Sequence, residues 1–365
     1  MTDPTQSTEI PPTGFGRWPR PGQWAALLGL SAAIVVPLEL SGFPAALLLG
    51  PMIAGITLGV GDARVRVAQP LFLLAQVVIG LMMAEALPPA IFSELVAEWP
   101  VYVLGIGSVV VVAAGLGILL ARLRVLPGTT AIWGSSPGAA GTIVVLADAF
   151  GADARLVAFM TYLRVAMVAL AASLVARFAA PGGAVPPPMD LLAPIEPVPF
   201  ALTCGLIAVI VVVTRVTRLK GGGVFLPIGV GVLLQNFAGF HIELPPPVLA
   251  VAFALIGWTI GLRFTRDILL HAWRALPAVA GSIAALIAIC GGFAFLLVWL
   301  AGVDPLTAYL ATSPGGADSV AIIAANSPVD VPFVMAMQAG RLLVVTFTGP
   351  WIARFIATRE WAKGL

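Results

Sequence analysis

The sequence predicts an all-α polytopic membrane protein made of two homologous inverted repeats, with about ten transmembrane helices and two re-entrant hairpins. First, 60% of the residues are hydrophobic and only 10% are charged, whereas a soluble domain carries about 25% charged residues. Second, apolar segments of membrane-spanning length follow one another along the chain. Third, a Ser-Pro-Gly motif interrupts two apolar segments, at Ser136-Pro137-Gly138 and at Ser313-Pro314-Gly315.

The composition argues against several classes of function. The net charge is only +2, and the basic residues lie between apolar segments, where membrane topology accounts for them. We therefore expect no nucleic-acid partner. Cys204 and Cys290 both lie inside apolar segments, so no disulfide framework is expected. His241 and His271 are far apart in expected loops, so the sequence predicts no metal site and no cofactor.

Five regions follow one another along the chain. Residues 1–20 are polar and proline-rich, which predicts a disordered cytoplasmic tail without a cleaved signal peptide. Residues 21–180 form membrane repeat 1, residues 181–198 a proline-rich linker and residues 199–358 membrane repeat 2, and residues 359–365 form a cytoplasmic tail. The predicted spans are 24–40, 44–60, 70–87, 99–121, 154–178, 199–214, 224–240, 247–264, 276–301 and 331–355, with broken segments at 126–150 and 305–327.

The two halves match each other at a constant offset of 177 residues. The matched positions are Gly80 with Gly257, Pro100 with Pro277, Asp153 with Asp330, Met160 with Met337, Arg164 with Arg341, and Arg177-Phe178 with Arg354-Phe355. Chance similarity between apolar helices does not align proline, aspartate and arginine in one ungapped frame. The pattern therefore predicts an internal duplication.

The distribution of charge favours an inverted arrangement of the two halves. If each broken segment is a re-entrant hairpin, each half crosses the membrane five times. Basic residues such as Arg64, Arg215 and Arg266 then fall on one side, and acidic residues such as Glu94 and Asp304 on the other. This predicts a multi-pass protein of the bacterial inner membrane with both termini in the cytoplasm and a periplasmic linker. Whether the hairpins are re-entrant or cross fully stays open.

The interrupted segments are the predicted binding site for a small anionic ligand. Ser136 and Ser313 can each cap a helix that begins at the following proline, which leaves backbone N–H groups and the positive helix end facing the break. A break in lipid persists where the backbone lines a cavity or is buried in protein. The predicted substrate-binding residues are Ser135, Ser136, Pro137, Gly138, Ala139, Thr142, Arg164, Thr312, Ser313, Pro314, Gly315, Gly316, Ser319 and Arg341.

Two arginines inside predicted spans accompany these breaks. Arg164 and Arg341 lie about ten residues into their helices, a depth of ~15 Å at ~1.5 Å per residue. An arginine at the bilayer centre costs roughly 2.5–3.5 kcal/mol, so it should face protein, water or a ligand. Its planar guanidinium suits bidentate binding of a carboxylate. The alternative is a structural pair, for example Arg341 with Asp318.

Asp318 is the acidic residue that breaks the symmetry between the two broken segments. It follows Pro314 by four residues, whereas the first half has Gly141 at the matching position. A single intramembrane carboxylate is a candidate ion-coupling residue for a proton or for sodium. It can equally serve as a counter-ion to an arginine.

On these motifs the sequence resembles the AbrB-duplication membrane family over residues 24–358. The duplicated Ser-Pro-Gly hairpins, the paired arginines, and the segments Leu49-Gly50-Pro51 and Leu226-Pro227 carry the resemblance. The second half lacks a glycine matching Gly50. The names given to that family imply an ammonia monooxygenase or a regulator of gene expression. A monooxygenase requires a metal or flavin site, and a DNA-binding regulator a basic soluble module, and neither pattern occurs in this sequence.

The sequence therefore favours a secondary transporter of a small anionic, carboxylate-like metabolite, working by alternating access around two opposed hairpins. The alternative is a membrane-embedded regulator or sensor that binds a ligand without transporting it. An enzyme is a more distant third, and the chain has no phosphate-binding loop that would indicate ATP-driven transport. The expected partners are the small anionic ligand and the lipid bilayer, and homo-oligomerisation stays open.

Overall fold

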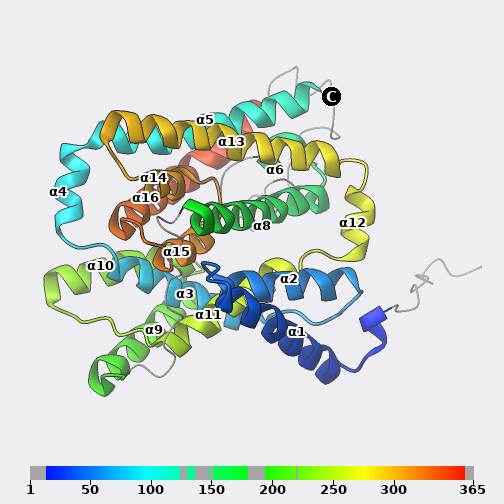
Figure 1. The fold of residues 1–365 in the computed structure, drawn as a ribbon, viewed down its shortest axis with the longest axis horizontal. Coiled ribbons are helices and arrows are strands. Elements are labelled where there is room, and N and C mark those ends of the chain that lie inside the picture. The colour runs from blue at the N-terminus through cyan, green and yellow to red at the C-terminus, as the bar shows by residue number, and fades with distance from the viewer. Residues whose placement is uncertain are drawn as a thin grey trace, which may run out of the picture.

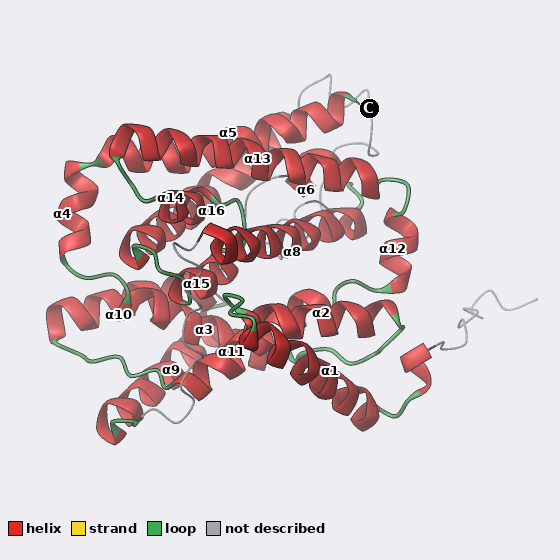
Figure 2. Ribbon diagram, viewed as in Figure 1, coloured by secondary structure: helices red, strands yellow, loops and turns green. Residues whose placement is uncertain are grey.

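The computed structural model describes residues 14–123, 130–135, 147, 151–179, 194–218 and 221–357. All regular structure in these residues is helical, as Figure 2 shows. After the short 3-10 helix η1 (Gly14–Arg17), the first half contains α1 (Arg20–Leu40), α2 (Ala46–Val60), α3 (Gln69–Glu85), α4 (Ala90–Ala97), α5 (Trp99–Arg122), α6 (Thr130–Ser135) and α8 (Ala154–Ala179). The second half contains α9 (Pro197–Thr217), α10 (Gly222–Ala238), α11 (Pro246–Gly261), α12 (Arg266–Ala272), α13 (Leu276–Ala301), α14 (Pro305–Thr312), α15 (Ala317–Ala325) and α16 (Val331–Ala357).

The ten apolar segments predicted as spans are all helical, so the all-α prediction is confirmed. Two short helices, α4 and α12, were not predicted, because a helix of seven or eight residues gives little hydropathy or periodicity signal. α12 has a local start signal in Thr265, whose hydroxyl oxygen accepts a hydrogen bond from the Ile268 N–H at 3.4 Å.

Several helices have the length and apolar composition needed to cross a membrane. In the described part of the chain, five helices meet these criteria singly, and up to seven spans result if each of two bent pairs counts as one. The pairs are α3 with α4, bent by 75°, and α11 with α12, bent by 50°. This is the architecture of a multi-pass helical protein. The prediction of ten crossings is not tested by these lengths.

The helices form two groups that lie one above the other in Figure 1. The upper group contains α5, α6, α8, α13, α14, α15 and α16, and the lower group contains α1, α2, α3, α9, α10 and α11. The short helices α4 and α12 join the groups at opposite ends of the molecule (Figure 1). Between the groups, α3 contacts α15, and α11 contacts α8.

Within the lower group, glycines allow helices from different halves of the chain to approach closely. A Cβ added to Gly257 of α11 would lie 2.5 Å from the carbonyl oxygen of Leu48 in α2. A Cβ added to Gly80 of α3 would lie 2.5 Å from Cγ of Pro227 in α10. Close approach of this kind is how small residues stabilise helix pairs in a bilayer. The third helix of each half thus packs on the second helix of the other.

A pair of matching hydrogen bonds fixes the start of the longest helix in each half. The Asp153 N–H donates to Oγ1 of Thr130 at 3.1 Å, and the Asp330 N–H donates to Oγ1 of Thr307, also at 3.1 Å. Both aspartates lie directly before a long helix, α8 in one case and α16 in the other. The two contacts lie 177 residues apart, at the offset that relates the two halves of the sequence.

Candidate functional site

The second Ser-Pro-Gly break separates α14 from α15 by four residues, Ser313 to Gly316. Ser313 has φ −60° and ψ 129°, and Gly316 has φ −67° and ψ 135°, so the chain is extended at both ends of the break. The prediction that Ser313 caps a helix beginning at Pro314 was wrong. Ser313 is the C-cap of α14, and α15 begins four residues later at Ala317, with Gly316 at its N-cap.

Arg341 supplies the physical reason for this extended break. From α16, its guanidinium donates hydrogen bonds to the carbonyl of Ser313 and to the carbonyl of Gly315, the latter at 2.7 Å. One turn earlier, the side-chain amide of Gln338 donates to the carbonyl of Leu310 at 2.8 Å. The Arg341 contacts satisfy two carbonyls of the extended break, as an apolar environment requires. The Leu310 carbonyl also accepts the N–H of Ser313 at 3.4 Å.

Of the predicted first break, only Ser135 at the end of α6 lies among the described residues. There the guanidinium of Arg164, from α8, donates to the carbonyl of Ser135 at the end of α6 over 3.5 Å. Each of the two predicted arginines thus reaches the backbone of the break in its own half. Five predicted site residues lie outside the described part of the chain, namely Ser136, Pro137, Gly138, Ala139 and Thr142.

A cavity of about 310 Å³ lies beside the second break, between the upper and lower groups of helices. Pro314, Gly315 and Gly316 of the break form part of its wall. The polar residues that line it are Gln69, Gln76, Thr161, Tyr162, Arg164, Thr259, Arg263, Asp318, Ser319 and Arg341. Among these described residues, three arginines face one carboxylate, so the lining carries an excess of positive charge. Such a lining favours an anionic ligand.

The start of α15 contributes a buried polar side chain to the wall of this cavity. Ser319 is 1% exposed and lines the cavity, and its hydroxyl has no hydrogen-bond partner among the described residues. Asp318 lies beside it in the first turn of α15, where a negative charge is favourable. Within the described part of the chain, no ion pair joins Asp318 to Arg341. A buried unsatisfied hydroxyl next to free helix amides is a feature that a ligand can satisfy.

Three predicted residues in the described part of the chain, Ser135, Thr312 and Ser313, do not line this cavity. The Thr312 hydroxyl donates to the Ala308 carbonyl of its own helix at 2.9 Å. Ser313 is buried, and its hydroxyl has no partner among the described residues. Ser135 lines a small adjoining recess of about 20 Å³ together with Arg164.

Several lining residues lie far from either motif, and sequence reasoning missed them. Gln69 and Gln76 come from α3, Tyr162 from α8, and Arg263 is the second residue after the end of α11. In the sequence, Arg263 has the pattern of a basic residue at the end of a predicted span, which membrane topology explains. No local pattern connects it to the breaks.

Comparison with known proteins shows the family. The chain matches the family model described as "Transition state regulatory protein AbrB" over residues 47–357, which include both breaks. This chain belongs to the AbrB family. A protein of Escherichia coli (strain K12) named "Putative regulator AbrB" is 44% identical over 337 residues, which cover 92% of this chain and 97% of that relative. The family resemblance predicted from the twin motifs is thereby confirmed.

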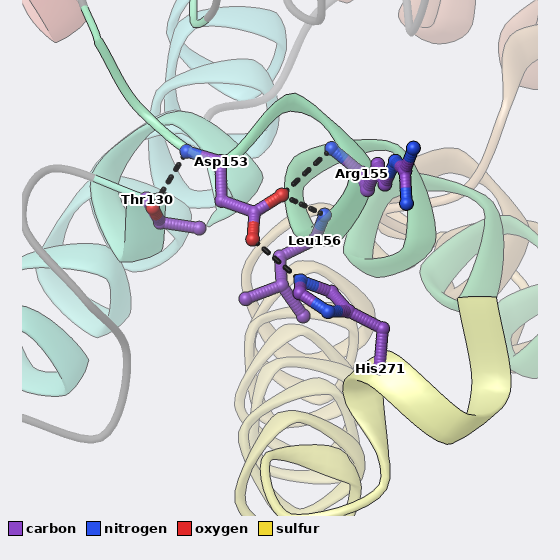
Figure 3. Close-up of polar contacts among 5 residues, drawn as sticks. All are labelled: Thr130, Asp153, Arg155, Leu156 and His271. Atoms are coloured by element: carbon purple, nitrogen blue, oxygen red, sulfur yellow. Dashed lines mark hydrogen bonds and ion pairs between the residues drawn. The ribbon is translucent and has the colours of Figure 1, made fainter. Parts of the chain in front are cut away.

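A second polar cluster in this AbrB-family chain ties α12 to the start of α8, and Figure 3 shows it. Asp153 caps α8, because its Oδ1 accepts from the N–H groups of Arg155 at 2.9 Å and Leu156 at 3.1 Å. Its Oδ2 lies 2.6 Å from Nε2 of His271. His271, predicted to lie in a loop, is on α12. In the described part of the chain, no group of three or more histidine, cysteine or acidic side chains is placed to hold a metal ion.

The charge of Asp153 is stabilised by these contacts. Partial burial raises the pKa of this carboxyl, but the hydrogen bonds from His271 and from the backbone at Leu156 and Arg155 lower the pKa by more than burial raises it. The pKa therefore lies below its ordinary value. Asp330 offers a natural comparison, because its Oδ1 likewise accepts from the Phe333 N–H at 3.0 Å at the start of α16.

We expect Asp153→Ala to destabilise the protein more than Asp330→Ala. Each change removes a helix cap, which costs about 1 kcal/mol, but only Asp153→Ala also removes the partner of His271. Unfolding temperatures of the two purified variants and of wild type measure the difference.

The same pair gives a pH test. Because the pKa of Asp153 is lowered in the folded state, its stabilisation is present above the ordinary aspartate pKa of roughly 3.9 and is lost as the pH falls through the lowered value. The deficit of Asp153→Ala relative to wild type should therefore shrink below about pH 4. Equal deficits for both variants at neutral pH would show that His271 adds nothing.

Proposed function

We propose that this protein is a secondary transporter of a small anionic, carboxylate-like metabolite in the bacterial inner membrane. The observation that carries the proposal is the cavity of about 310 Å³ beside a helix break, lined by Arg164, Arg263, Arg341 and the carboxylate of Asp318. Ligand sites of roughly 300–1,000 Å³ suit small molecules, so the ligand is small. Broken helices beside a cavity with charged lining residues, between packed groups of helices, are typical of transporters.

The proposed architecture is a pair of inverted repeats with the cavity between their helices. It is supported by the matching Thr130–Asp153 and Thr307–Asp330 hydrogen bonds. The reciprocal packing of α3 on α10 and of α11 on α2 also supports it. In this arrangement one group of helices moves relative to the other, and the cavity opens first to one side of the membrane and then to the other.

Asp318 is the proposed coupling residue. Its carboxylate lines the cavity and forms no ion pair with a described residue, so it is available to a proton or to sodium. Arg341, by contrast, holds the backbone of the break and adds positive charge to the cavity.

A second candidate function is ligand sensing without transport. The names of the family model and of the Escherichia coli relative both describe a regulator. In that case the same cavity binds the anion, and the helix groups signal its presence across the membrane.

Uptake into proteoliposomes separates the two functions. Purified full-length protein would be reconstituted and offered radiolabelled acetate, succinate and citrate under an imposed proton or sodium gradient. Saturable accumulation of one of these anions supports transport. Saturable binding without accumulation supports sensing, and the absence of both would overturn the two functions together.

The inverted topology predicts that the linker and the C-terminus lie on opposite sides of the membrane. Single cysteines at Ala184 and Ala362, both outside the described residues, would be introduced after replacing Cys204 and Cys290 by serine. An impermeant thiol reagent applied to intact cells should label the cysteine at 184 but not that at 362. Labelling of both, or of neither until the cells are lysed, would contradict the inverted repeat.

A further inference from the structure

The three arginines of the cavity differ in what their guanidinium groups do. Those of Arg164 and Arg341 donate to backbone carbonyls at the helix breaks. The guanidinium of Arg263 donates to none of the described residues and forms no ion pair with them. A guanidinium has five N–H donors in a planar arrangement. Those of Arg263 are therefore available to a ligand in the cavity.

Arg263 is held in place from one side. Its guanidinium carbon lies 5.3 Å from the centre of the Tyr162 ring, and both side chains line the cavity. A cation over an aromatic face is attracted to it and keeps its edge free for hydrogen bonds. Arg263 is exposed, whereas Ser319 is buried. Arg263 therefore belongs to the exposed part of the lining, and Ser319 to the buried part.

The surroundings of Arg263 are positive. Burial lowers the pKa of Arg66, in the connection before α3, and the charge of Arg263 lowers it further, so the two cations repel each other. Gln69, the first residue of α3, also lines the cavity and brings a positive helix end toward it. A bound anion would relieve this repulsion.

We propose that Arg263 is the side chain that binds the carboxylate of the ligand, while Arg164 and Arg341 serve mainly to hold the two breaks. This rests on the proposed binding of a small carboxylate in the cavity. The offset of 177 residues places Ala86 at the matching position of the first half. The arginine that binds the carboxylate is therefore present only in the second half. The cavity recognises its ligand asymmetrically, although the two Ser-Pro-Gly motifs are alike in sequence.

Binding of acetate, succinate and citrate to purified full-length protein, measured by calorimetric titration, tests the proposal. Arg263→Gln should weaken binding of whichever anion the wild type binds by about 10- to 100-fold, the range expected for losing hydrogen bonds to a charged group. Arg263→Lys should retain only part of the affinity, because the planar fork is lost. The matched control is Arg274→Gln, an exposed arginine outside the cavity, which should bind as wild type does.

Three outcomes would count against the proposal. Unchanged binding by Arg263→Gln would leave Arg263 as a charge at the membrane surface, with the proposed function intact. Equal losses in Arg263→Gln and Arg274→Gln would indicate a general effect of surface charge. Failure of all three anions to bind the wild type would overturn the proposed function and this inference with it.

Discussion

Arg341→Lys is expected to destabilise the folded protein by about 1–3 kcal/mol, the cost of leaving a buried hydrogen-bonding group unsatisfied. The guanidinium of Arg341 donates to the carbonyls of Ser313 and Gly315 at once. A lysine ammonium is a compact charge on a flexible stem and does not span two carbonyls in one plane. The segment between α14 and α15 should then no longer be held in its extended conformation. The unfolding temperature of the purified variant measures this loss.

The matched variants are Arg164→Lys and Arg274→Lys. Arg164 donates to the Ser135 carbonyl over 3.5 Å, so its replacement shows whether the arginine of the first half stabilises its break as Arg341 does. Arg274 is exposed and should be neutral. Carboxylate binding per folded molecule is measured in parallel. An Arg341→Lys protein that keeps its unfolding temperature but loses carboxylate binding would make Arg341 a direct ligand of the anion rather than a support of the break.

Asp318→Asn is expected to abolish gradient-driven accumulation of the anion while retaining ligand binding and exchange. Coupling to an ion gradient needs a group whose charge can change, and Asp318 is the acidic residue among the described residues that line the cavity. Asparagine keeps the size and hydrogen-bonding ability of the side chain at the start of α15 but cannot bind a proton or replace the carboxylate charge. Accumulation and exchange are compared in proteoliposomes with and without an imposed gradient.

Asp330→Asn is the control for this substitution. Asp330 caps α16 away from the cavity, and asparagine is as good a helix cap as aspartate, so accumulation should continue. An Asp318→Asn protein that still accumulates the anion, with unchanged dependence on pH and sodium, would remove Asp318 as the coupling residue. Loss of exchange as well as accumulation would mean that Asp318 is needed for binding itself.

The helical content and the position of the predicted spans follow from local information. Apolar segments separated by proline, glycine and charge indicate where helices run, and all ten predicted segments are helical. The duplicated motif also located the break between α14 and α15 correctly. Where α15 begins was predicted wrongly, because Ser313 has a good local capping signal that a contact with Arg341, 28 residues away, overrides.

The composition of the cavity was decided by tertiary structure. Arg263 and Tyr162 come from different halves of the chain, and their contact depends on how α11 packs against α8. The His271–Asp153 contact spans 118 residues in the same way. Hydropathy, periodicity and capping patterns act within about one or two helical turns. The sequence therefore determined the positions of the ten predicted helices, the twin motifs and the family. Which side chains meet across the interface between two groups of helices depends on the packing of whole helices, and only the folded structure specifies that.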